Sequence, residues 1–109
     1  MNGLTPLEQM ILGAIWSLDD DAYGVSIKKR IADLSGRELM YGTLYNALSQ
    51  LVRKELIGKS PGEPTPERGG RSKIYYRLTP LGHRAFREAY EVQFAFWGRL
   101  AELGRVLKP

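Results

Sequence analysis

The chain contains no cysteine and only one histidine, His83. Without cysteine it can form neither disulfides nor thiolate metal sites, and one histidine cannot make a Cys-His pair or a multi-histidine metal centre. Walker loops and dinucleotide-binding fingerprints are also missing, because Gly69-Gly70 is too short a glycine signal for either. The three adjacent aspartates at 19–21 fit solvated side chains better than cation ligands. We therefore expect no enzyme, no metal and no cofactor.

Long apolar runs are missing as well. No hydrophobic stretch approaches the 18 residues of a membrane-spanning helix, and the first residues do not form a basic-then-apolar signal peptide. The 109 residues, 43% hydrophobic and 26% charged, suit one globular domain with a small core. We expect a cytoplasmic protein.

Basic residues are absent from the first part of the chain. Residues 1–22 carry four acidic side chains and no Lys or Arg, whereas residues 23–78 carry eleven basic and five acidic side chains. Residues 79–109 add five basic and three acidic side chains. A basic surface in the middle segment would suit a phosphate backbone. On charge alone, an ordinary solvated surface explains the same excess equally well.

Three helices are predicted in the first half of the chain. Thr5-Pro6 followed by Glu8 has capping-box spacing and starts an amphipathic helix that runs to about Leu18. A second helix is predicted over 23–34 and a third over 41–54. The residues of the second helix that we expect to face inward are Ile27, Ile31 and Leu34. The outer face of the third helix is polar and nearly free of acidic residues.

Two strands and a long helix are predicted in the second half. Residues 57–60 and 73–78 have strand character, with Ile74, Tyr76 and Leu78 on the inward face. The Pro- and Gly-rich residues 61–70 between them should form a mobile loop. Thr79-Pro80 begins a last helix that extends towards Leu107. We predict a mostly α fold with a β-wing: a winged helix-turn-helix domain over 1–81, with its wing at 57–78, and a C-terminal dimerisation helix over 82–109.

The last helix has too much apolar surface for one small domain to cover. Its apolar arc is about 200° wide, whereas a surface helix needs a stripe of roughly 100°. We expect a second copy of the chain to cover the excess, which predicts a homodimer through residues 86–103. The expected interface residues are Phe86, Tyr90, Phe94, Phe96, Trp97 and Leu100.

The third helix and the wing carry the candidate contacts to double-stranded DNA. In a helix-turn-helix, the N-terminal residues of the second helix meet base edges in the major groove. On the third helix these candidates are Gly42, Thr43, Tyr45, Asn46, Ser49, Gln50 and Arg53. Arg68, Arg71 and Lys73 on the wing would contact phosphate or reach into the minor groove, and Lys28 on the second helix would contact the backbone. Without DNA binding, the same residues would be the solvent-exposed side of an amphipathic helix and the surface of a solvated hairpin.

The motifs Gly42-Thr43-Leu44-Tyr45 and Tyr75-Tyr76-Arg77-Leu78-Thr79-Pro80-Leu81-Gly82 resemble those of the PadR family of bacterial transcription regulators. Tyr23-Gly24 and Gly69-Gly70-Arg71 also match the family pattern, and the resemblance covers residues 4 to about 85. The chain is similar to the short branch, which has a single C-terminal helix. It departs from the pattern at Met40-Tyr41, which supplies no side-chain cap, and at Asn46, where proline is common.

The resemblance implies a winged helix-turn-helix fold, a dimer, and repression of promoters in response to small molecules. It also suggests a site for a flat apolar effector at the dimer interface. Its candidate residues are Trp97, Phe94 and Trp16. A plain dimer core explains the same aromatic residues. A winged-helix module that binds another protein, without specific DNA affinity, is the alternative function.

Overall fold

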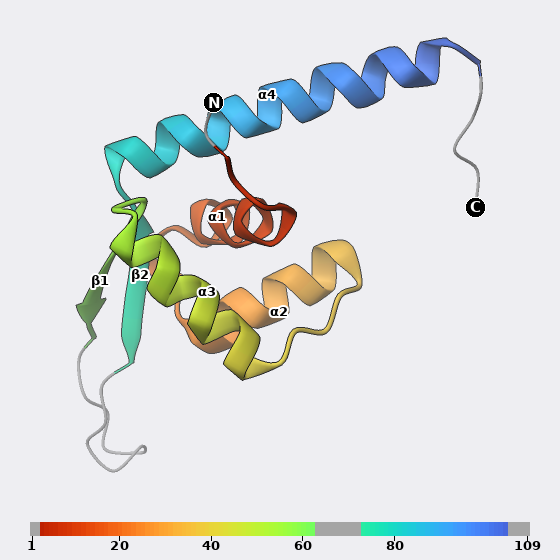
Figure 1. Cartoon of the computed structure of the whole chain (residues 1–109). Helices are drawn as coiled ribbons and strands as arrows, with labels where there is room; N and C mark the ends of the chain where they lie inside the picture. The colour runs from red at the N-terminus through yellow and green to blue at the C-terminus, as the bar shows by residue number, and fades with distance from the viewer. Residues whose placement is uncertain (1–2, 63–72, 105–109) are drawn as a thin grey trace.

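Helix α1 (Pro6–Leu18) lies at the centre of the molecule, between α4 on one side and the pair α2 and α3 on the other (Figure 1). The computed structural model describes residues 3–62 and 73–104. The N-terminal capping box of α1 is confirmed: the Thr5 hydroxyl accepts a hydrogen bond from the Glu8 amide at 3.1 Å, and the Glu8 carboxylate accepts one from the Thr5 amide at 3.0 Å. A 3₁₀ turn at Asp19–Asp21 follows the helix.

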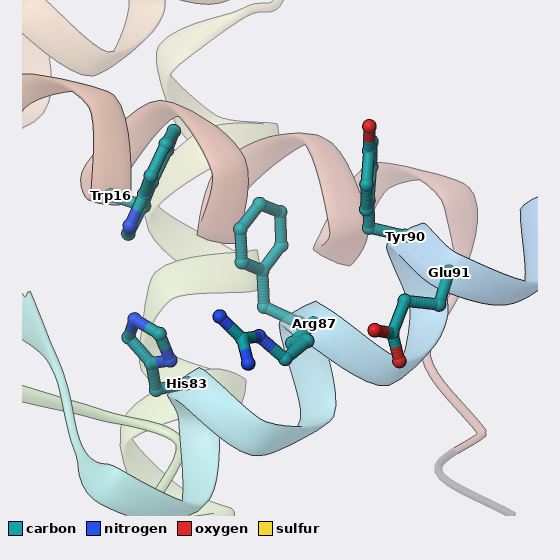
Figure 2. Close-up of a pocket in the computed structure, with 6 residues that line it drawn as sticks. Trp16, His83, Arg87, Tyr90 and Glu91 are labelled. Atoms are coloured by element: carbon teal, nitrogen blue, oxygen red, sulfur yellow. The ribbon is translucent and has the colours of Figure 1, made fainter. Parts of the chain in front are cut away.

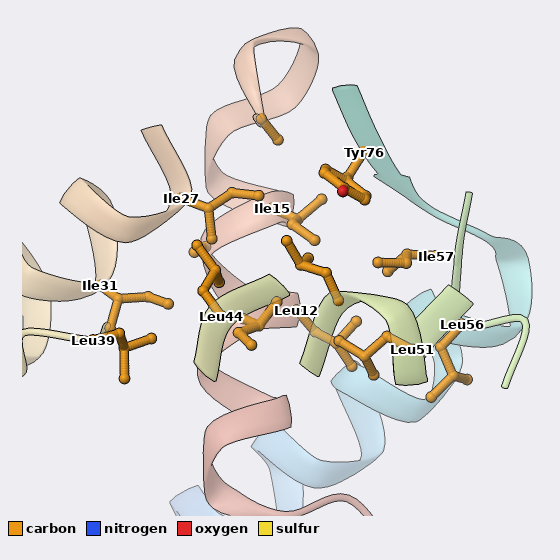
Figure 3. Close-up of a cluster of buried hydrophobic side chains, with 14 residues drawn as sticks. Leu12, Ile15, Ile27, Ile31, Leu39, Leu44, Leu51, Leu56, Ile57 and Tyr76 are labelled. Carbon is orange, nitrogen blue, oxygen red and sulfur yellow. The ribbon is translucent and has the colours of Figure 1, made fainter. Parts of the chain in front are cut away.

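Helices α2 (Gly24–Ser35) and α3 (Tyr41–Arg53) form the helix-turn-helix pair. Gly36, with φ of 76°, ends α2 in the left-handed conformation that glycine adopts without strain. The apolar sides of α1, α2 and α3 meet in one core (Figure 3). Its fully buried side chains are Ile11, Leu12, Ile15, Ile27, Leu44, Leu48, Leu51 and Ile57.

Leu34 is a wrong prediction, because its side chain is 75% exposed. It lies on the correct side of α2, in the same stripe as Ile27 and Ile31. It lines an open apolar cleft of about 280 Å³ whose walls include Gly13 of α1. Because this cleft is open to solvent, Leu34 is left exposed at the end of α2.

Strands β1 (Ile57–Pro61) and β2 (Ile74–Leu78) pair antiparallel, with Ile57 opposite Leu78 and Pro61 opposite Ile74. Tyr76 is buried as predicted. Ile74 is 42% exposed, so its inward assignment is wrong. It pairs with Pro61 at the end of the hairpin farthest from the Ile57–Leu78 pair. The loop prediction for 61–70 falls largely on residues 63–72, which lie outside the described residues.

Helix α4 (Pro80–Glu102) begins with a second cap, in which the Thr79 hydroxyl accepts from the Gly82 amide at 3.0 Å. The same hydroxyl donates to the Glu55 carbonyl at 2.6 Å, which ties the start of α4 to the end of α3. The helix ends at Glu102, so the extension towards Leu107 is wrong. Leu103 and Gly104 end it, Gly104 with φ of 74°. Across the described ranges, none of the helices is long and apolar enough to cross a membrane.

Candidate nucleic-acid interface

The outer face of α3 is fully available to a partner. Its predicted contact residues are all exposed, and α3 contains no acidic residue. These exposed residues are Gly42, Thr43, Tyr45, Asn46, Ser49, Gln50 and Arg53. The inner face, through Leu44, Leu48 and Leu51, is fully buried, so the core fixes the rotation of the helix about its axis. One continuous polar surface therefore faces outward.

Tyr45 has a structural role in addition to its exposed position. Its ring packs so closely on Gly24, the first residue of α2, that a Cβ at Gly24 would collide with the phenol. Tyr41 stacks on the other side, with the two ring centroids 6.1 Å apart. Gly24 of the Tyr23-Gly24 pair noted in the sequence therefore provides the surface on which Tyr45 packs. Sequence reasoning missed Tyr41 as part of this face.

Lys28 is only partly available to a phosphate. Its ammonium lies 3.3 Å from the Glu38 carboxylate and 5.3 Å from the centre of the Tyr41 ring. Its side chain is 23% exposed. On the same helix Arg30 donates to the Ser17 hydroxyl at 2.7 Å and so ties α2 to α1. Lys29, in contrast, is exposed.

The wing contributes fewer described cations than the sequence predicted. Arg68 and Arg71 lie outside the described residues. The Lys73 ammonium lies 4.2 Å from the centre of the Tyr23 ring, so its charge is directed at that ring. Lys59 on β1 and Arg77 on β2 are exposed cations that were not among the predicted contacts. Strand alternation could have identified Arg77, which lies on the face opposite to Tyr76, but not Lys59, which pairs with Tyr76.

The N-terminus of α3 has no side-chain cap, as its sequence predicted. Met40 is the N-cap residue, and its side chain forms no capping hydrogen bond. The first-turn amides of α3 therefore keep their capacity to bind an anion. Gly42 lies in this turn, and a Cβ there would meet nothing within 4 Å.

A second candidate site is an open cleft of about 550 Å³ between α1 and α4 (Figure 2). It is lined by Trp16, His83, Phe86, Arg87, Tyr90 and Glu91. Trp16, one of the predicted effector residues, contributes one wall, and the Phe86 ring packs against it with centroids 6.0 Å apart. Phe86, predicted for the dimer interface, is thus half-buried within its own chain.

The other predicted effector residues lie elsewhere. Phe94 and Trp97 are on the part of α4 that extends beyond α1 (Figure 1), and they are 68% and 50% exposed. Trp97 donates to Gln93 at 2.9 Å and meets Phe96 edge-on at 5.0 Å. Neither Phe94 nor Trp97 lines the cleft that Trp16 borders. Within one chain the three predicted residues are therefore not brought together.

Two ionisable side chains with shifted pKa values belong to the core rather than to these surfaces. Burial raises the pKa of Tyr76, and the nearby Tyr45 adds to the increase. Burial would also raise the pKa of Glu8, but Lys54 at 2.7 Å and the Thr5 amide outweigh it and lower the pKa below its ordinary value of 4.5. In the described part of the chain, no three acidic or histidine side chains form a group that could hold a metal ion.

Comparison with known proteins agrees with this architecture. A family model described as the transcriptional regulator PadR-like family matches residues 11–88. The fold is similar to a PadR-like transcriptional regulator from Bacillus cereus strain ATCC 14579, with a TM-score of 0.76, 20% identity and 92% of each chain covered. No curated protein matches.

Two further solved structures are closer in sequence. A PadR family transcription regulator from Clostridium difficile R20291 shares 25% identity and a TM-score of 0.71, over 91% of this chain and 97% of that one. A complex structure of hsRosR-S1 shares 30% identity and a TM-score of 0.66, over 84% and 74% of the two chains. Because the family model spans most of the helix-turn-helix, the wing and the start of α4, the chain belongs to the PadR-like family of transcriptional regulators.

Proposed function

We propose that the protein is a homodimeric, sequence-specific DNA-binding repressor whose recognition helix is α3. The single observation that supports this most strongly is the outer face of α3, which is polar, exposed and free of acid while its opposite face is fully buried. A phosphate backbone requires a surface without carboxylates, and base edges require hydrogen-bonding side chains. This face meets both requirements.

Each subunit would place the N-terminal half of α3 in a major groove. Asn46 would pair with an adenine, and Thr43 and Ser49 would meet neighbouring base edges. The uncapped first turn, at Gly42, would bind a phosphate through its amides. Gln50 and Arg53, further along the helix, would reach a base or the backbone.

The wing would add contacts to the backbone beside that groove. As predicted from the sequence, Arg68 and Arg71 of the wing would contact phosphates or reach into the minor groove. Lys59 joins them, because it is exposed on β1. Lys28 becomes a secondary contact, and Lys73 is no longer assigned to the DNA backbone, because each already faces an aromatic ring of its own chain.

The second copy would cover the overhanging part of α4. Residues 91–99 are all exposed, and they include Phe94, Phe96 and Trp97. Trp16 and Leu34 form further uncovered apolar surface beside α1. A two-fold dimer would bury these residues and place two copies of α3 about one helical turn of DNA apart, roughly 34–36 Å.

A flat apolar effector between the two copies of Trp97 would relieve repression by changing that spacing. Trp97 is accessible and its neighbours Phe96 and Phe94 are aromatic, which suits a planar ligand. The test is tryptophan fluorescence in a Trp16→Phe variant, where only Trp97 reports. A set of planar apolar cations should include one that quenches it, and no quenching by any of them contradicts the effector proposal.

The test of DNA binding is fluorescence anisotropy on the promoter upstream of the protein's own gene, with scrambled DNA of equal length as control. Between about 50 and 200 mM salt, promoter-selective binding with a steep salt dependence is expected. Weak and equal binding to both sequences contradicts the proposal. Binding to a protein partner without salt dependence would favour the interaction module instead.

A further inference from the structure

The hairpin of the wing is small and needs support from the rest of the molecule. It consists of two five-residue strands, and an isolated two-stranded hairpin is only marginally stable in water. Its support comes from the segment just before α2. The Tyr76 amide donates to the Ala22 carbonyl at 2.8 Å, and Tyr23 forms a single antiparallel bridge with Tyr75.

Side chains reinforce this backbone attachment at Tyr23. The Tyr75 ring meets the Tyr23 ring edge-on, with centroids 5.6 Å apart and planes at 66°. The Lys73 ammonium lies 4.2 Å from the centre of the same ring. Two residues of the wing therefore converge on one ring of the helix-turn-helix. We call Tyr23, Lys73 and Tyr75 the wing clamp.

The wing clamp connects the two parts of the proposed DNA-facing surface, the wing and α3. On the wing side, Gly62 donates to the Lys73 carbonyl at 2.6 Å and packs under the Tyr75 ring, where a Cβ would collide. On the helix side, Tyr23 is the N-cap residue of α2, and its amide donates to Ser26 at 2.9 Å. The Tyr45 ring of α3 packs against the next residue, Gly24.

We propose that Tyr23 and Lys73 are positioning residues, which hold the wing at a fixed orientation to α3 so that both elements meet DNA together. The inference rests on the proposed DNA-binding function. Lys73 thereby stabilises the protein–DNA complex through the ring of Tyr23, since an ammonium over an aromatic face is attracted by the ring quadrupole. Because the two strands of the wing are already ordered in the free protein, DNA binding does not cost the conformational entropy of ordering them.

The test compares Tyr23→Leu, which removes the ring without changing charge, with Lys73→Met, which removes the ammonium. Each should weaken operator binding roughly two- to fivefold, as the loss of one exposed cation–ring contact implies. The double variant should bind the operator about as tightly as the weaker-binding of the two single variants, because both substitutions break the same contact. Tyr23→Phe and Lys73→Arg keep the ring and the charge and should retain wild-type affinity.

Lys59→Met is the matched control, because it removes an exposed cation from the same hairpin outside the wing clamp. Its effect should add to that of Tyr23→Leu. Additive effects of Tyr23→Leu and Lys73→Met would overturn the proposal, because Lys73 would then act on DNA independently of the ring. Unchanged affinity in Tyr23→Leu would overturn it as well.

Hydrogen exchange of the free protein separates this inference from the proposed function. In Tyr23→Leu the Tyr76 amide should exchange faster, while the Ile15 amide in α1 keeps its protection. If the wild-type protein binds no operator, the DNA-binding proposal fails on its own, and exchange still decides the wing clamp. An unchanged exchange rate of the Tyr76 amide in Tyr23→Leu would overturn the proposed role of the wing clamp, whether or not the protein binds DNA.

Discussion

At the scale of single residues, Glu8 is the clearest case of a side chain with two roles. Its carboxylate completes the capping box of α1 and also binds the Lys54 ammonium at the end of α3. The Glu8 side chain is almost fully buried, whereas that of Lys54 is about half exposed. The pair joins α1 to the end of α3, and solvent at Lys54 limits its strength.

Glu8→Gln should lower the free energy of unfolding by about 1 kcal/mol at pH 7. Because the pKa of Glu8 is lowered in the folded protein, its contribution is complete above the ordinary value of 4.5 and is lost as the pH falls through the lower, folded value. Urea unfolding at pH 7 and pH 3 should therefore show the difference between variant and wild type shrinking in acid. Glu88→Gln, on the exposed side of α4, is the control and should change little at either pH. A difference of equal size at both pH values would show that the carboxylate charge is not its source.

Asn46 gives the residue-scale prediction for DNA. Asn46→Ala should reduce discrimination at one base pair by about 1–3 kcal/mol and leave binding to scrambled DNA unchanged. Arg71→Ala, by contrast, should weaken all sequences alike and reduce the salt slope by about 1. Anisotropy with a set of single-base operator variants measures both. If both substitutions weakened every sequence equally, Asn46 would not read a base.

At the scale of elements, the start of α4 depends on a close approach to the end of α3. A Cβ at Gly82 would collide with the Leu56 carbonyl, and the Leu56 carbonyl also accepts a hydrogen bond from the Thr79 amide at 3.1 Å. Glycine is therefore required here by contact, although Gly82 has ordinary helical backbone geometry. This explains the Thr79-Pro80-Leu81-Gly82 motif as a joint between the wing and α4.

Gly82→Ala should destabilise the protein by about 1–3 kcal/mol, because the backbone of Leu56 must move. Gly98→Ala is the matched control on the same helix, since a Cβ there meets nothing within 4 Å. It should stabilise the helix by about 0.5–1 kcal/mol through its higher helix propensity. Thermal unfolding of both variants tests this pair. Destabilisation by Gly98→Ala would instead indicate that a second molecule packs against that position.

At the scale of the whole molecule, α4 extends away from the domain that supports it (Figure 1). The helix is about 34 Å long at 1.5 Å per residue, and its exposed aromatic residues Tyr90, Phe94, Phe96 and Trp97 lie from its middle onwards. Apolar surface of this extent on one helix is typical of an interface. The proposed dimer would couple the positions of the two recognition helices through this helix.

Trp97→Asp should convert the dimer to a monomer, because it places a charge inside the apolar arc. Ala95→Asp introduces the same charge outside the apolar arc, on the side of α4 that faces away from its centre, and should leave the dimer intact. Sedimentation equilibrium over a range of concentrations measures the mass of each variant. A wild-type protein that remains monomeric, or equal effects of the two substitutions, would contradict the proposed interface.

The sequence by itself determined the order of the elements and the two faces of α3. The caps at Thr5 and Thr79, the missing cap at Met40 and the burial of Tyr76 were all predicted correctly. These features depend on residues three or four positions apart, or on strand alternation, so a linear pattern contains the information. The motifs around α3 and β2 also pointed to the correct family.

Only the tertiary structure decided which side chains already have partners. Lys28 and Lys73 were predicted as DNA contacts, but each faces a tyrosine from another part of the chain. Leu34 lies in an open cleft and Ile74 at the far end of the hairpin, so both are exposed although local spacing placed them on inward faces. The Glu8–Lys54 pair joins residues 46 positions apart. Such contacts depend on how elements pack across the molecule, and no local periodicity encodes them.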